Sequence, residues 1–196
     1  MSAAILLLAA LVLPVRAAAE GLRGATQSYS ADSITNSASN RSGSLAPNTL
    51  ASVYGADLAY VTRAVTADDI VAGGLPAALG GVNVFVGGLR AHLLYVSPQQ
   101  VNFLVPYSLL AGQVDFRVDR DGTRGPTVRL TLAETAPALF QLDPETALAA
   151  HADGSVVTRE APAQPDEVIV LYATGLGRTS PDPIAGQLAT YAAGLV

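Results

Sequence analysis

The chain has no cysteine, lysine or tryptophan, and each absence narrows what the protein can be. Without cysteine there is no disulfide framework, no thiol nucleophile, no thiolate ligand for a metal and no lipid anchor attached through a cysteine. Without lysine all eleven basic residues are arginines, and sixteen acidic residues give a net charge of −5. The composition therefore lacks the basic footprint of a protein that binds nucleic acid.

Long helical patterns are also missing, because eighteen glycines and twelve prolines interrupt the chain at short intervals. What is present instead is an alternation of apolar and polar residues with the period of two that is typical of strands. Residues 82–86 and 101–105 alternate in this way, and residues 114–118 and 128–132 do so on either side of an Asp-Gly turn signal at 121–122. Short strands at regular spacing predict an all-β fold, an Ig-like antiparallel β-sandwich.

One long apolar run stands at the N-terminus, from Ala3 to Val15. It is shorter than the roughly 20 residues that span a bilayer, and Arg16 and three alanines follow it. This is the pattern of a signal peptide that is cleaved after Ala19. We therefore expect residues 1–19 to direct export, and the processed protein, without a membrane span, to be secreted or held at the cell surface.

The stretch "PNTLASVYGADLA" at 47–59 has a second version, "PDEVIVLYATGLG", at 165–177. Four apolar or aromatic positions recur 118 residues later: Leu50, Val53, Tyr54 and Leu58 correspond to Val168, Leu171, Tyr172 and Leu176. We interpret each stretch as the first strand of a sandwich module. The sequence thus predicts an internal repeat whose second copy is incomplete.

This interpretation divides the chain into parts. After the signal peptide we expect a flexible lead-in over 20–44, a sandwich module over 45–143, a connector over 144–164 and the start of a second module over 165–196. The strand predicted at 168–173 would then lack a partner strand of its own. It would dock on the edge of the first module, pair with another copy of the chain in homo-association, or fray.

Several stretches also carry a resemblance to a known family. The most specific are "LLYVSPQQVNFLVP" at 93–106 and "VIVLYATGLG" at 168–177. Over residues 34–196 the chain resembles a family of uncharacterised domains that is abundant in acidobacterial (Solibacter-type) secreted proteins, often at their C-termini. The stretch at 45–59 is also similar to the start of IPT/TIG Ig-like domains. The resemblance implies an extracellular Ig-like module with no established catalytic or ligand-binding residues.

The same resemblance bears on the second module. Family members that look complete carry a second block similar to "GGVNVFVGG…YVSPQQVNF", which stands at 80–88 and 95–103 in this chain. This chain has no second block of that kind. The resemblance therefore implies a second module that is only begun.

Two short motifs suggest ligand sites but have simpler interpretations. "ATGLGR" at 173–178 contains one G-x-G but no Lys-Ser/Thr pair and no helix start, so we interpret it as a strand-ending turn and not as a phosphate loop. "DRDG" at 119–122 lacks the further oxygen ligands of a calcium loop and is interpreted as a hairpin turn. A weak cation site formed by Asp166, Glu167 or Asp182 is left as an alternative.

The only two histidines in the sequence are His92 and His151, and they lack the spacing of a zinc site. The sequence also has no G-x-S-x-G nucleophile elbow. We therefore predict no catalytic residue, no metal and no cofactor, so that the protein is not an enzyme. A hydrolase with an unrecognised site that uses the histidines is the alternative.

The stretch "YVSPQQVNF" at 95–103 supplies the candidate binding residues. Tyr95, Gln99, Gln100 and Asn102 place one ring and three amides beside a Ser-Pro turn. Such groups suit sugar hydroxyls and pyranose faces, but they equally form a hydrogen-bonded corner that fixes the turn, which is the interpretation we favour. We therefore expect an exported, non-catalytic interaction or structural module whose partner is a surface protein or a polysaccharide. A carbohydrate-binding module is the alternative.

Overall fold

The computed structural model describes residues 26–43, 45–187 and 194–195. The predicted signal peptide lies outside these residues. The regular structure within them is strand, apart from two 3-10 turns, η1 (Ala31–Ser33) and η2 (Ala67–Asp69). The predicted all-β class is confirmed. The described residues include no helix that could span a bilayer.

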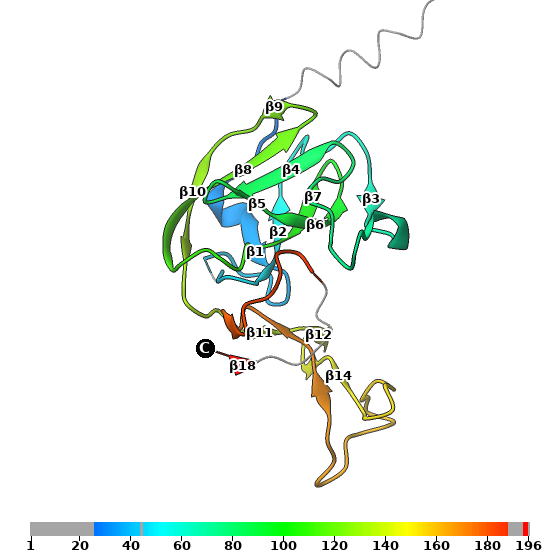
Figure 1. The fold of residues 1–196 in the computed structure, drawn as a ribbon. Helices are drawn as coiled ribbons and strands as arrows, with labels where there is room; N and C mark the ends of the chain where they lie inside the picture. Colours follow the sequence, from blue (N-terminus) through cyan, green and yellow to red (C-terminus); the bar gives the residue numbers. More distant parts are fainter. Residues whose placement is uncertain (1–25, 44, 188–193, 196) are drawn as a thin grey trace, which may run out of the picture.

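Two antiparallel sheets form the main body of the protein (Figure 1). The strands of the first sheet, in spatial order, are β1 (Ile34–Asn36), β2 (Leu50–Tyr54), β7 (Gln100–Leu104), β6 (His92–Val96) and β3 (Arg63–Ala64). Those of the second are β10 (Val128–Leu132), β8 (Gly112–Arg120), β4 (Val82–Val86) and β5 (Leu89–Arg90), with β9 (Thr123–Arg124) paired to β8. The body is therefore the predicted sandwich.

The residues predicted to face inward fill the space between the sheets. Val82, Val84 and Val86 are fully buried on β4. Phe103 on β7 meets Phe116 on β8 across the core, with 5.3 Å between ring centroids. Burying one such side chain contributes about 1.5–3 kcal/mol to folding, so this alternating face is the main source of stability.

The predicted hairpin also forms. Asp121 and Gly122 make the turn between β8 and β9, with φ of 46° and 79°. Both residues adopt the positive φ that a two-residue hairpin loop requires, and Asp-Gly is one of the pairs that tolerates it. Beyond this turn, β10 pairs with β8 in the register Val128↔Phe116. "DRDG" is thus a hairpin turn.

The structure differs from the prediction in the lead-in, where residues from Gln27 onward belong to the sandwich. Ile34 is fully buried, and β1 pairs with β2 in the register Ile34↔Val53. The Tyr29 hydroxyl accepts a hydrogen bond from the Val118 N–H at 2.8 Å and donates one to the Pro126 carbonyl at 2.5 Å. Side-chain hydrogen bonds anchor this segment, and a segment poor in apolar residues gave no pattern from which to expect that.

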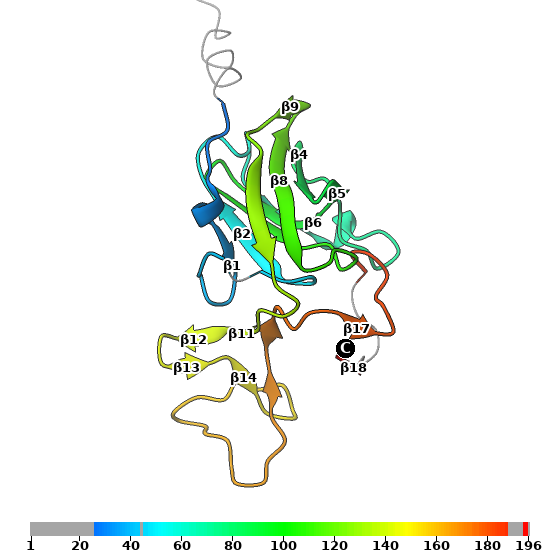
Figure 2. The same ribbon diagram turned by 90° about the vertical axis from the view of Figure 1, so that its left-hand side faces the viewer.

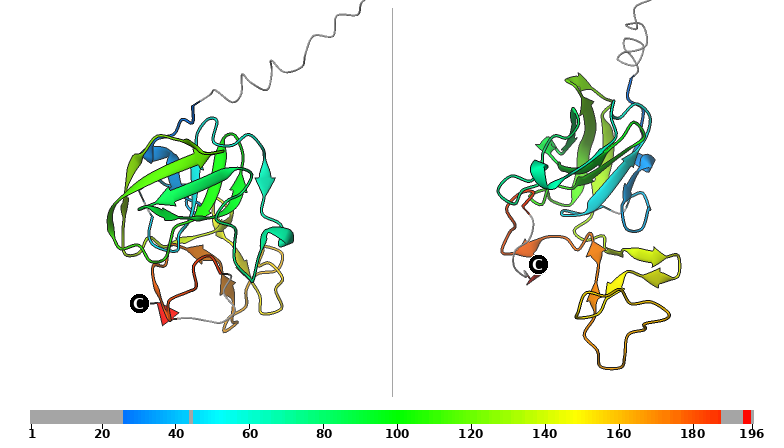
Figure 3. Two further views of the ribbon diagram at one scale, coloured as in Figure 1. Left: turned by 45° about the horizontal axis from the view of Figure 1, so that its top comes forward. Right: turned by 90° about the vertical axis from the view of Figure 1, so that its right-hand side faces the viewer.

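Most of the described chain after β10 forms a smaller layer beneath the sandwich (Figures 2 and 3). Its strands pair two by two: β11 (Ala138–Leu139) with β16 (Ala173–Thr174), β12 (Gln141–Asp143) with β13 (Thr146–Ala147), β14 (Ala149–Ala150) with β15 (Val170–Leu171), and β17 (Thr179–Ser180) with β18 (Gly194–Leu195). The predicted connector thus contains strands.

The expectation that the strand at 168–173 has no partner within the chain is wrong. Val170 and Leu171 pair with Ala150 and Ala149 in β14. Farther along, β16 pairs with β11, and the Tyr172 carbonyl accepts a hydrogen bond from the Phe140 N–H at 2.9 Å. The pairing with β14 escaped prediction because two consecutive alanines carry no signal that identifies their partner strand.

This small layer is also bonded to the sandwich. The Leu50 N–H donates to the Thr174 hydroxyl at 2.7 Å, and the Asn48 amide donates to the Gly177 carbonyl at 3.2 Å. Gly175 and Gly177 adopt φ of 75° and 87° in the turn that follows β16. The "ATGLGR" stretch is therefore a strand-ending turn that rests on the first sheet.

Candidate functional site

The outer face of the first sheet brings three of the four predicted binding residues together. Tyr95 on β6 lies opposite Asn102 on β7, because a register shift between Leu93 and Tyr95 turns the tyrosine outward. Gln100 shares the face of Asn102, two residues away on the same strand. The Gln100 amide donates a hydrogen bond to the Asn102 side-chain oxygen at 2.7 Å.

Gln99 does not join them. It is exposed in the turn between β6 and β7, where only its backbone is bonded: its N–H donates to the Ser97 hydroxyl at 3.3 Å and its carbonyl accepts from the Gly55 N–H at 3.0 Å. The Ser97 hydroxyl also accepts from the Gln100 N–H at 2.9 Å. The corner is therefore fixed by a serine, and not by the amide side chain of Gln99.

A residue that sequence reasoning missed completes this face. Tyr54, at the end of β2, lies opposite Gln100 and is 38% exposed. One tyrosine thus stands beside each amide, on the two strands that flank β7. Alternation along the sequence already places Tyr54 on the same face of its strand as the buried Ser52. Assigning Tyr54 to this site also requires knowing that β2 lies beside β7.

The hydrogen-bonding capacity of this face is partly used. The Asn102 side-chain oxygen accepts from the Ser52 hydroxyl at 3.0 Å as well as from Gln100. Among the described residues the Asn102 amide nitrogen and the Gln100 side-chain oxygen have no partner. The face therefore presents one donor and one acceptor between two aromatic rings, a combination that can hydrogen-bond and stack on a sugar.

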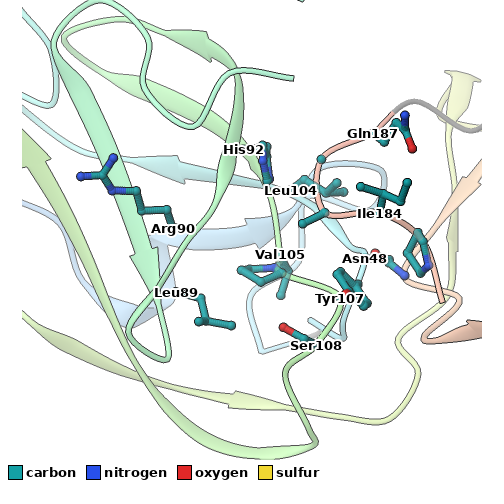
Figure 4. A pocket seen from close by; sticks show the side chains of 14 residues that line it. Asn48, Leu89, Arg90, His92, Leu104, Val105, Tyr107, Ser108, Ile184 and Gln187 are labelled. Carbon is teal, nitrogen blue, oxygen red and sulfur yellow. The ribbon is translucent and has the colours of Figure 1, made fainter. Parts of the chain in front are cut away.

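A cavity of about 260 Å³ lies at the ends of β6 and β7, where residues 183–187 fold against the sandwich (Figure 4). Its walls are mostly apolar: Leu104, Val105 and Ile184 contribute to them, and the Arg90 guanidinium points away from the space between them (Figure 4). No carboxylate lines it among the described residues.

His92 lines this cavity from β6, and burial lowers its pKa below the ordinary value of 6.5. The backbone of Gly186, at φ 67°, lies against the imidazole so closely that a Cβ there would be 2.2 Å from the ring. The Leu75 N–H holds the segment by donating to the Gly186 carbonyl at 2.8 Å. The backbone of Gly186 thus covers one side of the His92 ring, and burial favours its neutral form. No carboxylate among the described residues lines the cavity beside it to orient the ring as a general base.

The second histidine lies apart from the first, in the small layer. His151 Nδ1 is 2.5 Å from a Glu167 carboxylate oxygen, and its Nε2 is 3.2 Å from the Ala161 carbonyl. Both neighbours are acceptors, and these hydrogen bonds, first that of Glu167, raise the pKa of His151 above 6.5. When protonated, the ring donates to both acceptors and ties the end of β14 to the loop before β15.

This arrangement also bears on the cation alternative. Glu167 is bonded to His151 and to the Gln164 N–H at 2.8 Å, while Asp182 pairs with Arg178 at 3.1 Å. The described residues hold no group of three or more histidine or acidic side chains placed to bind a metal ion. The acidic residues named from the sequence are thus spread over separate contacts.

Comparison with known proteins adds no assignment: no protein-family model matches the chain, and no curated protein matches its sequence significantly.

Proposed function

We propose that the protein is an exported, non-catalytic Ig-like module that acts by binding a partner at the cell surface or outside the cell. The observation that carries the proposal is an exposed apolar segment on the small layer, residues 168–172. Its side chains, Val168, Ile169, Val170, Leu171 and Tyr172, are each between 37% and 78% exposed, although β15 at its centre is paired with β14. Contiguous exposed apolar side chains of this kind mark interaction sites.

The proposal includes the family resemblance and the internal repeat that the sequence predicts. The repeat is supported by matching backbone geometry: Asn48 and Asp166, 118 residues apart, have φ of 62° and 64°, and Asp57 and Gly175, at the same offset, have φ of 57° and 75°. Positive φ is uncommon outside glycine, so its recurrence at equivalent positions favours two copies of one unit.

Export is tested by expressing the full chain with its own N-terminus and measuring its intact mass and location. We expect a processed protein that begins at Glu20, outside the cytoplasm. An unprocessed protein that stays in the cytoplasm would contradict this part of the proposal.

Carbohydrate binding is the second candidate, and the arrangement of Tyr54, Gln100, Asn102 and Tyr95 on one outer face favours it. Affinity electrophoresis of the folded protein through gels that contain soluble polysaccharides measures it directly. We expect Tyr95→Ala to abolish retardation without changing the melting temperature, and Tyr107→Ala, which alters the cavity instead, to keep it. Retardation that survives Tyr95→Ala, or that is absent from the unmodified protein, would exclude this candidate.

A further inference from the structure

We propose that the open edge of the segment 168–172, which contains β15, accepts one antiparallel strand donated by a partner polypeptide, and that this strand has the pattern of β7, uncharged and apolar at alternate positions. The inference rests on the interaction function proposed above and specifies its partner. Its basis is that the first module contains the same edge with the added strand in place.

The strand register in the small layer matches that in the sandwich. In the sandwich, Ile34 and Thr35 of β1 pair with Val53 and Ser52 of β2. In the small layer, Ala149 and Ala150 pair with Leu171 and Val170, the residues 118 positions after Val53 and Ser52. Beyond each of these outer strands the chain turns back and forms a further bridge, Thr35↔Ser42 in one case and Ala150↔Val156 in the other. β14 therefore occupies the place of β1.

The backbone groups of residues 169–172 point alternately toward β14 and away from it. The Tyr172 N–H donates to the Leu148 carbonyl at 3.4 Å and its carbonyl accepts from Phe140, so Tyr172 bonds toward β14 and β11. Backbone groups of successive residues in a strand point to opposite edges. Ile169 and Leu171 therefore direct their N–H and carbonyl groups away from β14. Within the described residues no strand pairs with that edge.

In the sandwich, the equivalent edge of β2 is covered by β7. The residues equivalent to Ile169 and Leu171 are Ala51 and Val53, which pair with Phe103 and Val101 of β7. The strand "QVNFL" of β7 places apolar side chains at every second position. This defines the donated strand, which runs antiparallel to residues 168–172 and is about five residues long.

The exposure of the side chains also indicates that a neighbouring strand is absent from this edge among the described residues. Val53 and Ala51 are fully buried, whereas Leu171 and Ile169 are 52% and 37% exposed. No charged residue interrupts 168–172, and an uncharged edge strand is a template for strand addition unless a charge or a proline blocks it. Main-chain hydrogen bonds would give such a complex its affinity, and the alternating apolar side chains its specificity.

The test uses a synthetic peptide with the sequence of residues 98–106, "PQQVNFLVP", labelled with a fluorophore, and the processed protein. Anisotropy measures its binding, and amide hydrogen exchange locates it. We expect saturable binding and slower exchange at the Ile169 and Leu171 amides, by about tenfold or more, without change at the Val170 and Tyr172 amides, which already bond to their partners. A peptide with lysine in place of its valines and phenylalanine serves as the control ligand.

Two variants distinguish edge pairing from nonspecific adhesion. Leu171→Pro removes an N–H that points to the open edge and leaves those of Val170 and Tyr172 intact, so peptide binding should be lost while the β14–β15 amides stay protected. Leu171→Lys keeps the N–H and should weaken binding about tenfold or more, because it places a charge on the edge. Leu110→Lys, at a residue that is 69% exposed on the sandwich, is the matched control and should bind normally.

Equal binding to the Leu171→Pro variant, or no binding at all, would overturn the proposal. Protection of the Ile169 and Leu171 amides that rises with protein concentration in the absence of peptide would instead assign the edge to a second copy of this chain. Failure here leaves the mass and location of the exported protein unaffected, so the two proposals fail separately.

Discussion

Asn48 and Asp166 adopt the same left-handed backbone conformation, and each is followed by a residue whose side chain closes the same turn. The Thr49 hydroxyl accepts from the Ala46 N–H at 2.9 Å, and the Glu167 carboxylate accepts from the Gln164 N–H at 2.8 Å. In both turns the backbone N–H of the capping residue returns a bond, to the Ala46 or the Gln164 carbonyl, at 3.1 Å. Two turns of different sequence thus place the strand that follows in the same way.

The first prediction concerns Asn48, whose amide also bonds to Gly177. Asn48→Ala should lower the free energy of unfolding by about 1–2 kcal/mol, because alanine pays more for positive φ and the bond is lost. Asn48→Gly relieves the backbone strain and should cost less than the alanine variant. Urea denaturation measures both, and an alanine variant as stable as the glycine variant would contradict the account.

The second prediction concerns Tyr29, which anchors the segment before β1. Tyr29→Phe should destabilise the protein by about 1–3 kcal/mol, because it leaves the Val118 N–H and the Pro126 carbonyl without their partner. Tyr54→Phe, which removes the hydroxyl of a partly exposed tyrosine, is the matched control and should change stability by less than about 0.5 kcal/mol. Equal effects of the two substitutions in denaturation curves would show that the anchor contributes nothing.

A third prediction follows from the pKa of the same hydroxyl. Burial raises the pKa of Tyr29 to about 12 from its ordinary value of 10.0. The folded state thus disfavours the phenolate, so the contribution of Tyr29 to stability is present below pH 10 and declines as pH rises from 10 toward 12. Thermal melts of the unmodified protein and of Tyr29→Phe should converge over that range. A difference in melting temperature that stays constant over this pH range would contradict the prediction.

The fourth prediction uses the two histidines. NMR titration should find the His151 pKa above 6.5 and the His92 pKa below it. A raised histidine pKa contributes stability that is present below 6.5 and is lost as pH rises through the folded value. Glu167, whose pKa is lowered, contributes stability that is present above 4.5 and is lost as pH falls through its folded value. Both contributions are fully present between pH 4.5 and pH 6.5, so amide protection in the loop at 161–167 should be greatest there.

His151→Gln removes the titrating partner of Glu167 and should flatten the pH dependence of amide protection in that loop above pH 6.5. His92→Gln is the control and should leave the loop unchanged. If both histidines titrate at the same pH, the assignment of His151 as a doubly donating ring is wrong.

The fifth prediction tests the segment that covers the cavity. Gly186→Ala should detach residues 183–187 from the sandwich, because the new Cβ would collide with His92. The Leu75 amide should then exchange faster, and the His92 pKa should return toward 6.5 as solvent reaches the ring. Gly154→Ala has the same positive φ strain, at 85°, but no atom within 4 Å of the new Cβ, and should alter neither measurement.

How far the sequence could predict this molecule depended on side-chain chemistry. A half-buried strand could be predicted from Val82, Val84 and Val86, because apolar side chains in such a strand recur at every second residue. Asp121 and Gly122 announced a hairpin because few residues tolerate positive φ in succession. These local rules located most of the sandwich and its all-β class.

Where hydrogen bonds or strand order decide the outcome, the sequence was insufficient. Ala149 and Ala150 are a strand only because Leu171 and Val170 lie beside them, and no local preference predicts that pairing. Tyr54 joins Gln100 only because β2 and β7 are neighbours. Gln99 was named with the amides because it is next to them in sequence, but the turn that Ser97 closes keeps it apart from the face that Gln100 and Asn102 share.

The sandwich also separates the two ends of the described chain. The described chain begins (blue) near β9, at the end of the body farthest from the small layer, and β14, to which β15 is paired, lies at the opposite end (Figures 1 and 2). A protein tethered to a surface through its N-terminal side would therefore hold residues 168–172 away from the attachment point. Immobilised in that orientation, it would act as a built-in spacer that displays a strand to the solution.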